Sequence, residues 1–404
     1  MTATTSDFCS ETELPVIPAR RAAHCPLQPP PEFASWRDEP GLQRAIYHNE
    51  PVWVVSRYQD IRAALVDPRL SADTLPDTLK AQSGDTKAIM FARTDDPEHH
   101  RLRRMMTSDF TFRRCEKMRP QIQEMVDTFL DEMIDGGPPA DLVREFALPV
   151  PSLVIALLLG VPSEDLADFQ QYTGVGLDTK STVEEKTQAF TSMYGYIQEL
   201  VQRKESDPSD DLISRLVIEQ VATGQLNRET AALSGMTMLV AGHETTANMI
   251  SLGTVALLEH PDIFKRLGQT DDHAVIANIV EELMRYLTIV HGQVDRIATE
   301  DLTLGGQLVR AGDKLLMNLP AGNWDNEFVD SPDTFDVDRN TRGHLGFGYG
   351  VHQCIGANLA RVEMQVAFAT LARRLPGLQL AVSPDELKFK DADIYGMKEL
   401  PVRW

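Results

Sequence analysis

The sequence predicts a mainly α-helical protein with a minor β portion. Apolar residues recur at helical spacing through most of residues 98–287. Short alternating runs with glycine turns then follow from residue 295 to residue 318. The chain has 404 residues and no repeat, low-complexity segment or clear linker. We therefore expect one domain over residues 1–404, a helix-rich body with a small β region from the N- and C-terminal parts.

The N-terminal half is expected to alternate between helices and short irregular segments. A proline-rich arm precedes a short helix, and a strand at Val52–Ser56 precedes a helix from about Asp60. Residues 67–92 contain several breakers and predict a loop. Further helices are expected from about Glu98, at 115–135, from Pro149, and at 163–172, 183–204 and 210–220.

A long helix dominates the second half of the predicted order. It runs from about Arg228 to Glu259, with Asn227 as its N-cap. Its apolar stretch holds His243 and Glu244 near the centre, where a charge in lipid would be costly, so we expect a buried helix. Another helix follows at 273–287, then short strands, and a last long helix begins after Cys354 and ends near residue 376.

Composition narrows the class of protein. The net charge of −21 disfavours nucleic acid and anionic membranes as partners. Four scattered cysteines argue against a disulfide framework and a cysteine-rich zinc site. The N-terminus lacks the basic start and apolar stretch of a signal peptide. We expect a cytoplasmic monomer that binds neither nucleic acid nor membrane.

Basic residues nevertheless gather in one segment. They suggest a bound anion, an acidic partner or simply a solvated helix face. The segment holds Arg101, Arg103, Arg104, Arg113, Arg114, Lys117 and Arg119 against only Asp109 and Glu116.

Cys354 lies behind a glycine-rich run at the start of the last helix. Glycines allow a tight turn and a close approach to something flat or bulky. A thiol just before a helix N-terminus is favoured as the thiolate, which can ligate a metal. From the residues alone, a metal ligand, a nucleophile, a disulfide half and a buried core thiol all remain open.

Two further motifs lie on predicted helices. Glu282 and Arg285 are three residues apart and share a helical face, where they can form a buried ion pair. The long helix contains Ala241-Gly242-His243-Glu244-Thr245-Thr246, in which an acid and an alcohol need partners or a function if buried. No H-E-x-x-H, G-x-S-x-G or G-x-x-x-x-G-K-S/T pattern is present.

Together these motifs resemble the cytochrome P450 family over essentially the whole chain. Residues 347–356 fill the family's haem-binding pattern F-x-x-G-x-x-x-C-x-G. The resemblance implies the cytochrome P450 fold, with haem b (iron protoporphyrin IX) between the long central helix and the cysteine loop. Cys354 would be the axial thiolate ligand of the iron, and Glu244 and Thr245 would handle protons during oxygen activation.

The resemblance also implies roles for other residues. Glu282 and Arg285 would lock the core as a structural ion pair, with Arg339 as a third member. The expected haem contacts are His99, Arg103, Ala241, Gly242, Arg296, Phe347, His352, Cys354 and Gly356. The expected substrate-pocket residues are Met90, Leu239, Val290, Val294 and Ile394, with His291 and Asp295 adding polar selectivity.

The implied function is oxygen-dependent hydroxylation or epoxidation of a mid-sized apolar organic substrate, such as a secondary metabolite, macrolide, steroid, terpenoid or xenobiotic. Electrons would come from a ferredoxin and its reductase, since no flavin or nicotinamide domain is recognisable in the chain. Arg104, Arg113 and Arg114 could steer that partner. Trp324 departs from the family, because it replaces a common arginine and changes local packing and charge.

Three alternatives remain beside this function. A haem-thiolate nitric oxide reductase is resembled in parts such as "LVREFALPVPS". That class and peroxide-using relatives usually lack the acid–alcohol pair that Glu244 and Thr245 form here. A non-catalytic haem sensor would need no proton relay and would be expected to carry an output domain.

Overall fold

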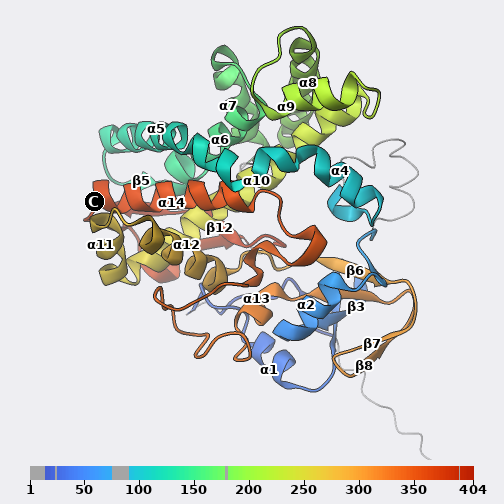
Figure 1. The fold of residues 1–404 in the computed structure, drawn as a ribbon. Coiled ribbons are helices and arrows are strands. Elements are labelled where there is room, and N and C mark those ends of the chain that lie inside the picture. Colours follow the sequence, from blue (N-terminus) through green and yellow to red (C-terminus); the bar gives the residue numbers. More distant parts are fainter. Residues whose placement is uncertain (1–13, 23–24, 75–90, 178–180, 391) are drawn as a thin grey trace, which may run out of the picture.

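The computed structural model describes residues 14–22, 25–74, 91–177, 181–390 and 392–404. Figure 1 shows α5 to α9 gathered in one part of the molecule and α1, α2, β3 and β6 in another, with α4 between them at one edge. The α-helices are α1 (Glu32–Asp38), α2 (Tyr58–Val66), α4 (Glu98–Thr107), α5 (Phe112–Gly136), α6 (Pro149–Leu159), α7 (Leu166–Leu177), α8 (Val183–Ser206), α9 (Leu212–Arg215), α10 (Arg228–Leu258), α11 (Pro261–Gln269), α12 (His273–Leu287), α13 (Leu319–Asn323) and α14 (Ala357–Arg374).

Short helical turns and strands complete the described order. The 3₁₀ and π segments are η2 (Ser108–Phe110), η3 (Val143–Ala147), η4 (Ser163–Asp165), η5 (Leu216–Val221), η6 (Leu345–Phe347), η7 (Gly350–His352) and η8 (Pro384–Glu386). The strands are β1 (Val16–Ile17), β2 (Gln43–Tyr47), β3 (Glu50–Val55), β4 (Leu70–Ser71), β5 (Ala140–Asp141), β6 (Asp295–Ala298), β7 (Leu302–Leu304), β8 (Gln307–Val309), β9 (Lys314–Met317), β10 (Gln379–Leu380), β11 (Lys388–Lys390), β12 (Gly396–Glu399) and β13 (Pro401–Arg403).

The largest sheet joins segments far apart in the chain. Its strand order is β1-β2-β3-β9-β6-β4. Strands β3 and β9 pair in parallel with Val54 opposite Leu316, whereas β6 and β9 are antiparallel. Along β6 the burial alternates, and Arg296 and Ala298 are the buried residues. The sheet thus fixes Arg296 with its side chain turned inward, although arginine is rarely buried.

Helix α10 is the centre of the helical part. The Asn227 side chain caps it by accepting a hydrogen bond from the Thr230 amide at 2.7 Å. Helices α6, α8, α12 and α14 all pack against it. Residues 246–257 are buried without interruption, which suits a helix that is apolar on nearly every side.

The predicted class, mainly α with a minor β portion, is confirmed. The helical stretch expected at 210–220 is present as the four-residue α9 followed directly by the π-helical η5. Helix α11 was not expected, because it has only nine residues and follows the long helix after two residues. Its strongly two-sided pattern buries Phe264 and Leu267.

Candidate functional site

A tight turn presents the Cys354 thiol just before α14. The Cys354 amide donates a hydrogen bond to the Phe347 carbonyl at 2.9 Å, which closes the turn. Gly350 has a φ of 75°, and a Cβ there would lie 2.8 Å from the Leu65 carbonyl oxygen, so a larger residue would push the turn away from α2. Gly350 is therefore favoured both by its positive φ and by its close packing against α2.

Cys354 is an exposed residue, although protein atoms surround its thiol closely. Burial raises its pKa, while the Gly356 amide and the nearby Arg103 act in the opposite direction without prevailing. The Gly356 and Ala357 amides at the helix N-terminus thus act in the expected direction, toward the thiolate. A coordinated metal cation would stabilise the thiolate far more strongly than amides do.

Phe347 braces the turn from behind. It is 9% exposed, and the Arg361 guanidinium lies 4.5 Å from the centre of its ring. Arg361 and His344 both bond Glu281, at 2.9 and 3.0 Å. Burial raises the pKa of Glu281, but these two partners outweigh it and lower that pKa to about 2. A charged network of Glu281, His344 and Arg361 therefore supports the cysteine turn.

Four cationic or imidazole side chains meet beside the cysteine turn. His99 and Arg103 come from α4, Arg296 from β6 and His352 from η7. The rings of His99 and His352 lie 4.0 Å apart, and Arg103 donates to the Gln353 carbonyl at 2.6 Å. The structure thus brings together all four residues predicted to contact the haem propionates.

Two imidazole nitrogens of the cluster lack partners among the described residues, although Arg103 and Arg296 each donate to a backbone carbonyl. His99 Nε2 and His352 Nδ1 are buried without a hydrogen-bond partner. Burial lowers the pKa of His352 to about 3, and the neighbouring His99, Arg296 and Arg103 add to that effect. Two carboxylates would give these ring nitrogens hydrogen-bond partners and would neutralise the positive charge of the two arginines. The donor set therefore fits the propionates of haem, with Cys354 as the adjacent metal ligand.

The middle of α10 carries the predicted oxygen-handling residues. Thr245 Oγ1 donates to the Ala241 carbonyl at 2.7 Å, and Ala241 itself is exposed. Glu244 is partly exposed and pairs with Lys390 at 3.1 Å. Lys390 was not expected from the sequence, because a lysine 146 residues away on a short strand has no motif around it.

Gly242 has a different explanation from the one the sequence suggested. A Cβ at this position would lie 2.6 Å from Ile155 Cδ1 of α6. Its small size therefore accommodates the packing of α10 on α6. A contact between Gly242 and haem stays a prediction, whereas Ala241 is the exposed small residue of the motif.

The expected substrate-pocket residues have mixed placements. Val290 and Ile394 are brought together by an isolated antiparallel bridge, and Val294 packs in the same apolar cluster as Val290. Met90 lies outside the described residues. Leu239 is fully buried in the main core, so it has no surface to offer a substrate.

Val240 is the pocket candidate that the sequence reasoning missed. It is apolar, 41% exposed and adjacent to the exposed Ala241 on a helix that is otherwise largely buried. It lies four residues before Glu244, whereas Leu239 is turned about 100° away from it on the helix. Counting helical positions back from the Glu244–Thr245 motif would have identified Val240.

The two polar residues expected at the pocket are already engaged. His291 Nε2 lies 2.8 Å from Arg21 Nη2, and its ring stacks on Tyr395. Arg21 in turn donates to the Leu287 carbonyl at 2.6 Å. Asp295 pairs with Arg93. These contacts tie the N-terminal arm and the loops near the site together, and they leave neither side chain free for substrate selection.

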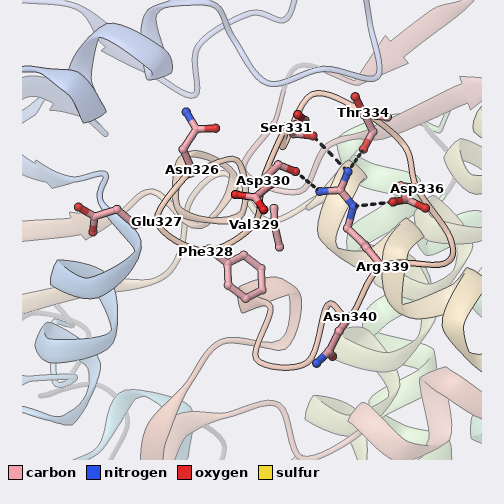
Figure 2. Close-up of a pocket in the computed structure, with 10 residues that line it drawn as sticks. All are labelled: Asn326, Glu327, Phe328, Val329, Asp330, Ser331, Thr334, Asp336, Arg339 and Asn340. Carbon is pink, nitrogen blue, oxygen red and sulfur yellow. Dashed lines mark hydrogen bonds and ion pairs between the residues drawn. The ribbon is translucent and has the colours of Figure 1, made fainter.

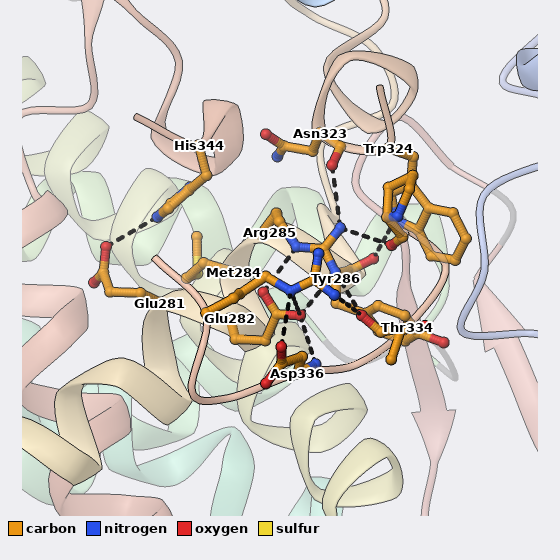
Figure 3. Close-up of polar contacts among 12 residues, drawn as sticks. Glu281, Glu282, Met284, Arg285, Tyr286, Asn323, Trp324, Thr334, Asp336 and His344 are labelled. Carbon is orange, nitrogen blue, oxygen red and sulfur yellow. Dashed lines mark hydrogen bonds and ion pairs between the residues drawn. The ribbon is translucent and has the colours of Figure 1, made fainter. Parts of the chain in front are cut away.

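Glu282 and Arg285 form a fully buried ion pair at 2.8 Å, shown in Figure 3. Arg285 also donates to three backbone carbonyls, those of Asn323, Pro332 and Thr334. Arg339 lies 3.6 Å from Glu282. The polar groups of the pair thus bond to the surrounding loop, which indicates a structural role for the pair.

The loop that receives this pair also surrounds a surface hollow of about 700 Å³, shown in Figure 2. Its lining runs from Asn326 to Asn340 and includes no residue of the predicted haem or substrate site. Nearby, Trp324 is 9% exposed and donates to the Tyr286 carbonyl at 2.9 Å. The residue that departs from the family therefore fills core space and adds no charge to the surface.

The basic segment is partly neutralised within the protein. Arg101 pairs with Glu98, Arg114 with Asp210, and Arg119 with Glu116. The exposed basic residues with no ion pair among the described residues include Arg104, Arg113 and Lys117. Arg114 is thereby less suited to a partner than the sequence suggested.

Comparison with known proteins shows the family. The model for "Cytochrome P450" matches residues 43–190 and 177–384. The chain is 45% identical to cytochrome P450-SU2 of Streptomyces griseolus, covering 99% of this chain and 100% of that protein. The crystal structure of GfsF matches with a TM-score of 0.90 and 45% identity, over 96% of this chain and 100% of that one.

A solved structure with a ligand is also similar. Mycinamicin VIII C21 methyl hydroxylase MycCI from Micromonospora griseorubida, bound to mycinamicin VIII, matches with a TM-score of 0.84 and 37% identity, covering 97% of this chain and 100% of that one. The protein belongs to the cytochrome P450 family. It is a monooxygenase of that class with a haem cofactor. None of the helices in the described part of the chain has the length and apolar character needed to cross a membrane.

Proposed function

We propose that the protein hydroxylates or epoxidises a mid-sized apolar organic substrate, with O₂ as oxidant and electrons from a ferredoxin and its reductase. The observation that carries this proposal is the exposed Cys354 thiol beside four converging propionate donors. Haem, when bound, supplies oxygen activation to this site. An apolar substrate is supported by the apolar side chains of Val240, Val290 and Ile394.

Each of the site residues would have a distinct role. Cys354 would ligate the iron, and His99, Arg103, Arg296 and His352 would hold the propionates. Thr245 would present its hydroxyl at the exposed stretch of α10, and the adjacent Glu244 would exchange protons there. The similar hydroxylase bound to mycinamicin VIII supports a substrate of secondary-metabolite type.

We further propose that residues 1–404 act as one domain, a cytoplasmic monomer that binds neither nucleic acid nor membrane. One main apolar core supports the single domain, because it includes residues from Leu27 to Val402. The scattered cysteines and the net charge of −21 support the remaining features.

Spectroscopy of the reduced, carbon-monoxide-bound protein tests the ligand. We expect the red-shifted Soret band that gives the family its name, and its complete loss in Cys354→Ala because no thiolate then reaches the iron. Cys25→Ala is the matched control and should keep the band. An unshifted wild-type band, or a shifted band that survives in Cys354→Ala, would overturn the proposed ligand.

The substrate is tested by titrating macrolides, steroids, terpenoids and xenobiotics while the Soret band is followed. We expect at least one apolar compound to shift the band and to be oxidised when ferredoxin, reductase and O₂ are supplied. Turnover of nitric oxide with NADH alone, and no oxidised product from the panel, would favour a nitric oxide reductase instead.

A further inference from the structure

Glu244 shares its side of α10 with Asn248, one turn further on, and both face the β11–β12 hairpin. Lys390 of that hairpin places its Nζ 3.1 Å from Glu244 Oε1 and 3.4 Å from Asn248 Oδ1. The Lys390 side chain is only 10% exposed, and the Glu244 side chain is 34% exposed. Such an enclosed ammonium needs a negative partner. Among the described residues, the carboxylate paired with it is that of Glu244.

The hairpin is fixed in place, so Lys390 is not an adaptable surface lysine. Gly396 lies directly against Asn248, where a Cβ would come within 2.1 Å of the amide oxygen. In the loop that joins the two strands, the Asp393 carbonyl accepts from the His291 amide at 2.8 Å, and the Tyr395 amide donates to the Ile289 carbonyl at 2.7 Å. These contacts hold the strand that carries Lys390 at a set distance from α10.

The ion pair with Lys390 draws the Glu244 carboxylate toward the hairpin. Thr245 and Ala241 lie on the adjacent row of the helix surface, and their hydroxyl and carbonyl are bonded to each other. A carboxylate that carries protons between the hairpin side and the Thr245 row must therefore loosen its contact with Lys390. The ion pair consequently sets the resting position of the acid.

We propose that Lys390 is a positioning residue for Glu244, acting through this ion pair to set how efficiently protons reach the site of oxygen activation. The inference rests on the proposed proton role of Glu244. Lys388 is a matched control, because it lies on the same strand, is 66% exposed and pairs with Glu399 at 2.7 Å, away from Glu244.

The test compares Lys390→Met, Lys390→Arg, Lys388→Met, Glu244→Gln and the Glu244→Gln/Lys390→Met double variant, all loaded with haem. The probe is the panel compound that gives the largest Soret shift. We expect Lys390→Met to lower the product formed per NADH consumed by about fivefold, as loss of a partly exposed ion pair permits.

Three comparisons make the test specific. Lys390→Arg should restore most of the coupling, Lys388→Met should match the wild type, and Lys390→Met should add little in the Glu244→Gln background. A double-mutant cycle of urea unfolding for Glu244 and Lys390 should show a coupling that weakens with salt, independently of turnover. Haem content should stay unchanged in every variant.

Two results would overturn the inference while leaving the proposed function intact. One is wild-type coupling in Lys390→Met when Glu244→Gln is impaired. The other is an equal loss from Lys390→Met with and without Glu244, which would mean that the lysine acts through another group. Unimpaired Glu244→Gln would instead remove the proposed proton role of the acid itself.

Discussion

At the residue scale, His243 is a neutral imidazole enclosed by two helices. It is 2% exposed on α10, and its Nε2 lies 2.9 Å from the Leu148 carbonyl at the start of α6. Its Nδ1 is buried without a partner, so the charged ring would add a donor that nothing accepts. Burial accordingly lowers the pKa of His243 to about 4.

This burial makes stability depend on pH. The unfolded chain titrates His243 near its ordinary value of about 6.5, so it takes up a proton that the folded protein resists. Stability should be complete above that pH and should fall as the pH drops toward 4, by about 3 kcal/mol in total. Urea unfolding of His243→Gln should show a shallower fall than the wild type. Exposed His100→Gln should keep the wild-type slope, and parallel slopes for all three proteins would contradict the expectation.

Single residues also show how much of the candidate site could be predicted from the sequence. The cysteine turn and the meeting of His99, Arg103, Arg296 and His352 beside it could be predicted, because each lies in a recognisable motif, and their contact with haem stays a prediction. Leu239 was chosen where Val240 is exposed, since one residue of error turns a helical side chain by about 100°. Lys390 could not be predicted at all, because only the tertiary packing of the hairpin brings it to Glu244.

At the element scale, the pair on α12 organises a long loop. Arg285 joins Glu282 of its own helix to the carbonyls of Asn323, Pro332 and Thr334, and the Asp336 amide donates to Glu282 at 2.9 Å. Both ion-pair partners are fully buried, so neither has water to replace a lost partner. The pair therefore fixes the loop that leads to the cysteine turn.

Removing one partner should be severe. Arg285→Met would leave the buried Glu282 carboxylate with only the Asp336 amide and the more distant Arg339, at 3.6 Å, and we expect a loss of about 3–5 kcal/mol in the free energy of unfolding. Arg310→Met, whose partner Asp301 is exposed, is the control and should cost at most about 1 kcal/mol. Urea unfolding followed by circular dichroism measures both. Equal costs would mean that the buried pair does not hold the loop.

Element boundaries were predictable where caps and prolines mark them. The Asn227 cap and the start of α6 at Pro149 agree with expectation. The π-helical η5 and the order of the large sheet were not predictable, because both depend on packing between distant segments. Strand β9, for example, pairs with β3, which lies more than 250 residues earlier in the sequence, and no local pattern encodes that parallel pairing.

At the scale of the whole molecule, one basic region stands out on a protein whose net charge is negative. The net charge is −21, yet α4 and the start of α5 expose Arg104, Arg113 and Lys117. The same region carries Arg103, which bonds the loop of Cys354. An acidic ferredoxin would be repelled by most of this surface and attracted here, close to the proposed iron ligand.

The orientation of the electron donor should therefore depend on this surface and on salt. We expect the Arg104→Glu/Arg113→Glu variant to lower kcat/KM for ferredoxin by about tenfold at low ionic strength, with the difference shrinking as salt screens the exposed charges. A single charge reversal in Arg310→Glu, on the β7–β8 side of the sheet, changes the net charge by half as much and should have little effect. Stopped-flow reduction of the haem under carbon monoxide measures the rate directly. Equal sensitivity of both variants would assign the effect to net charge and would remove α4 and α5 as the docking surface.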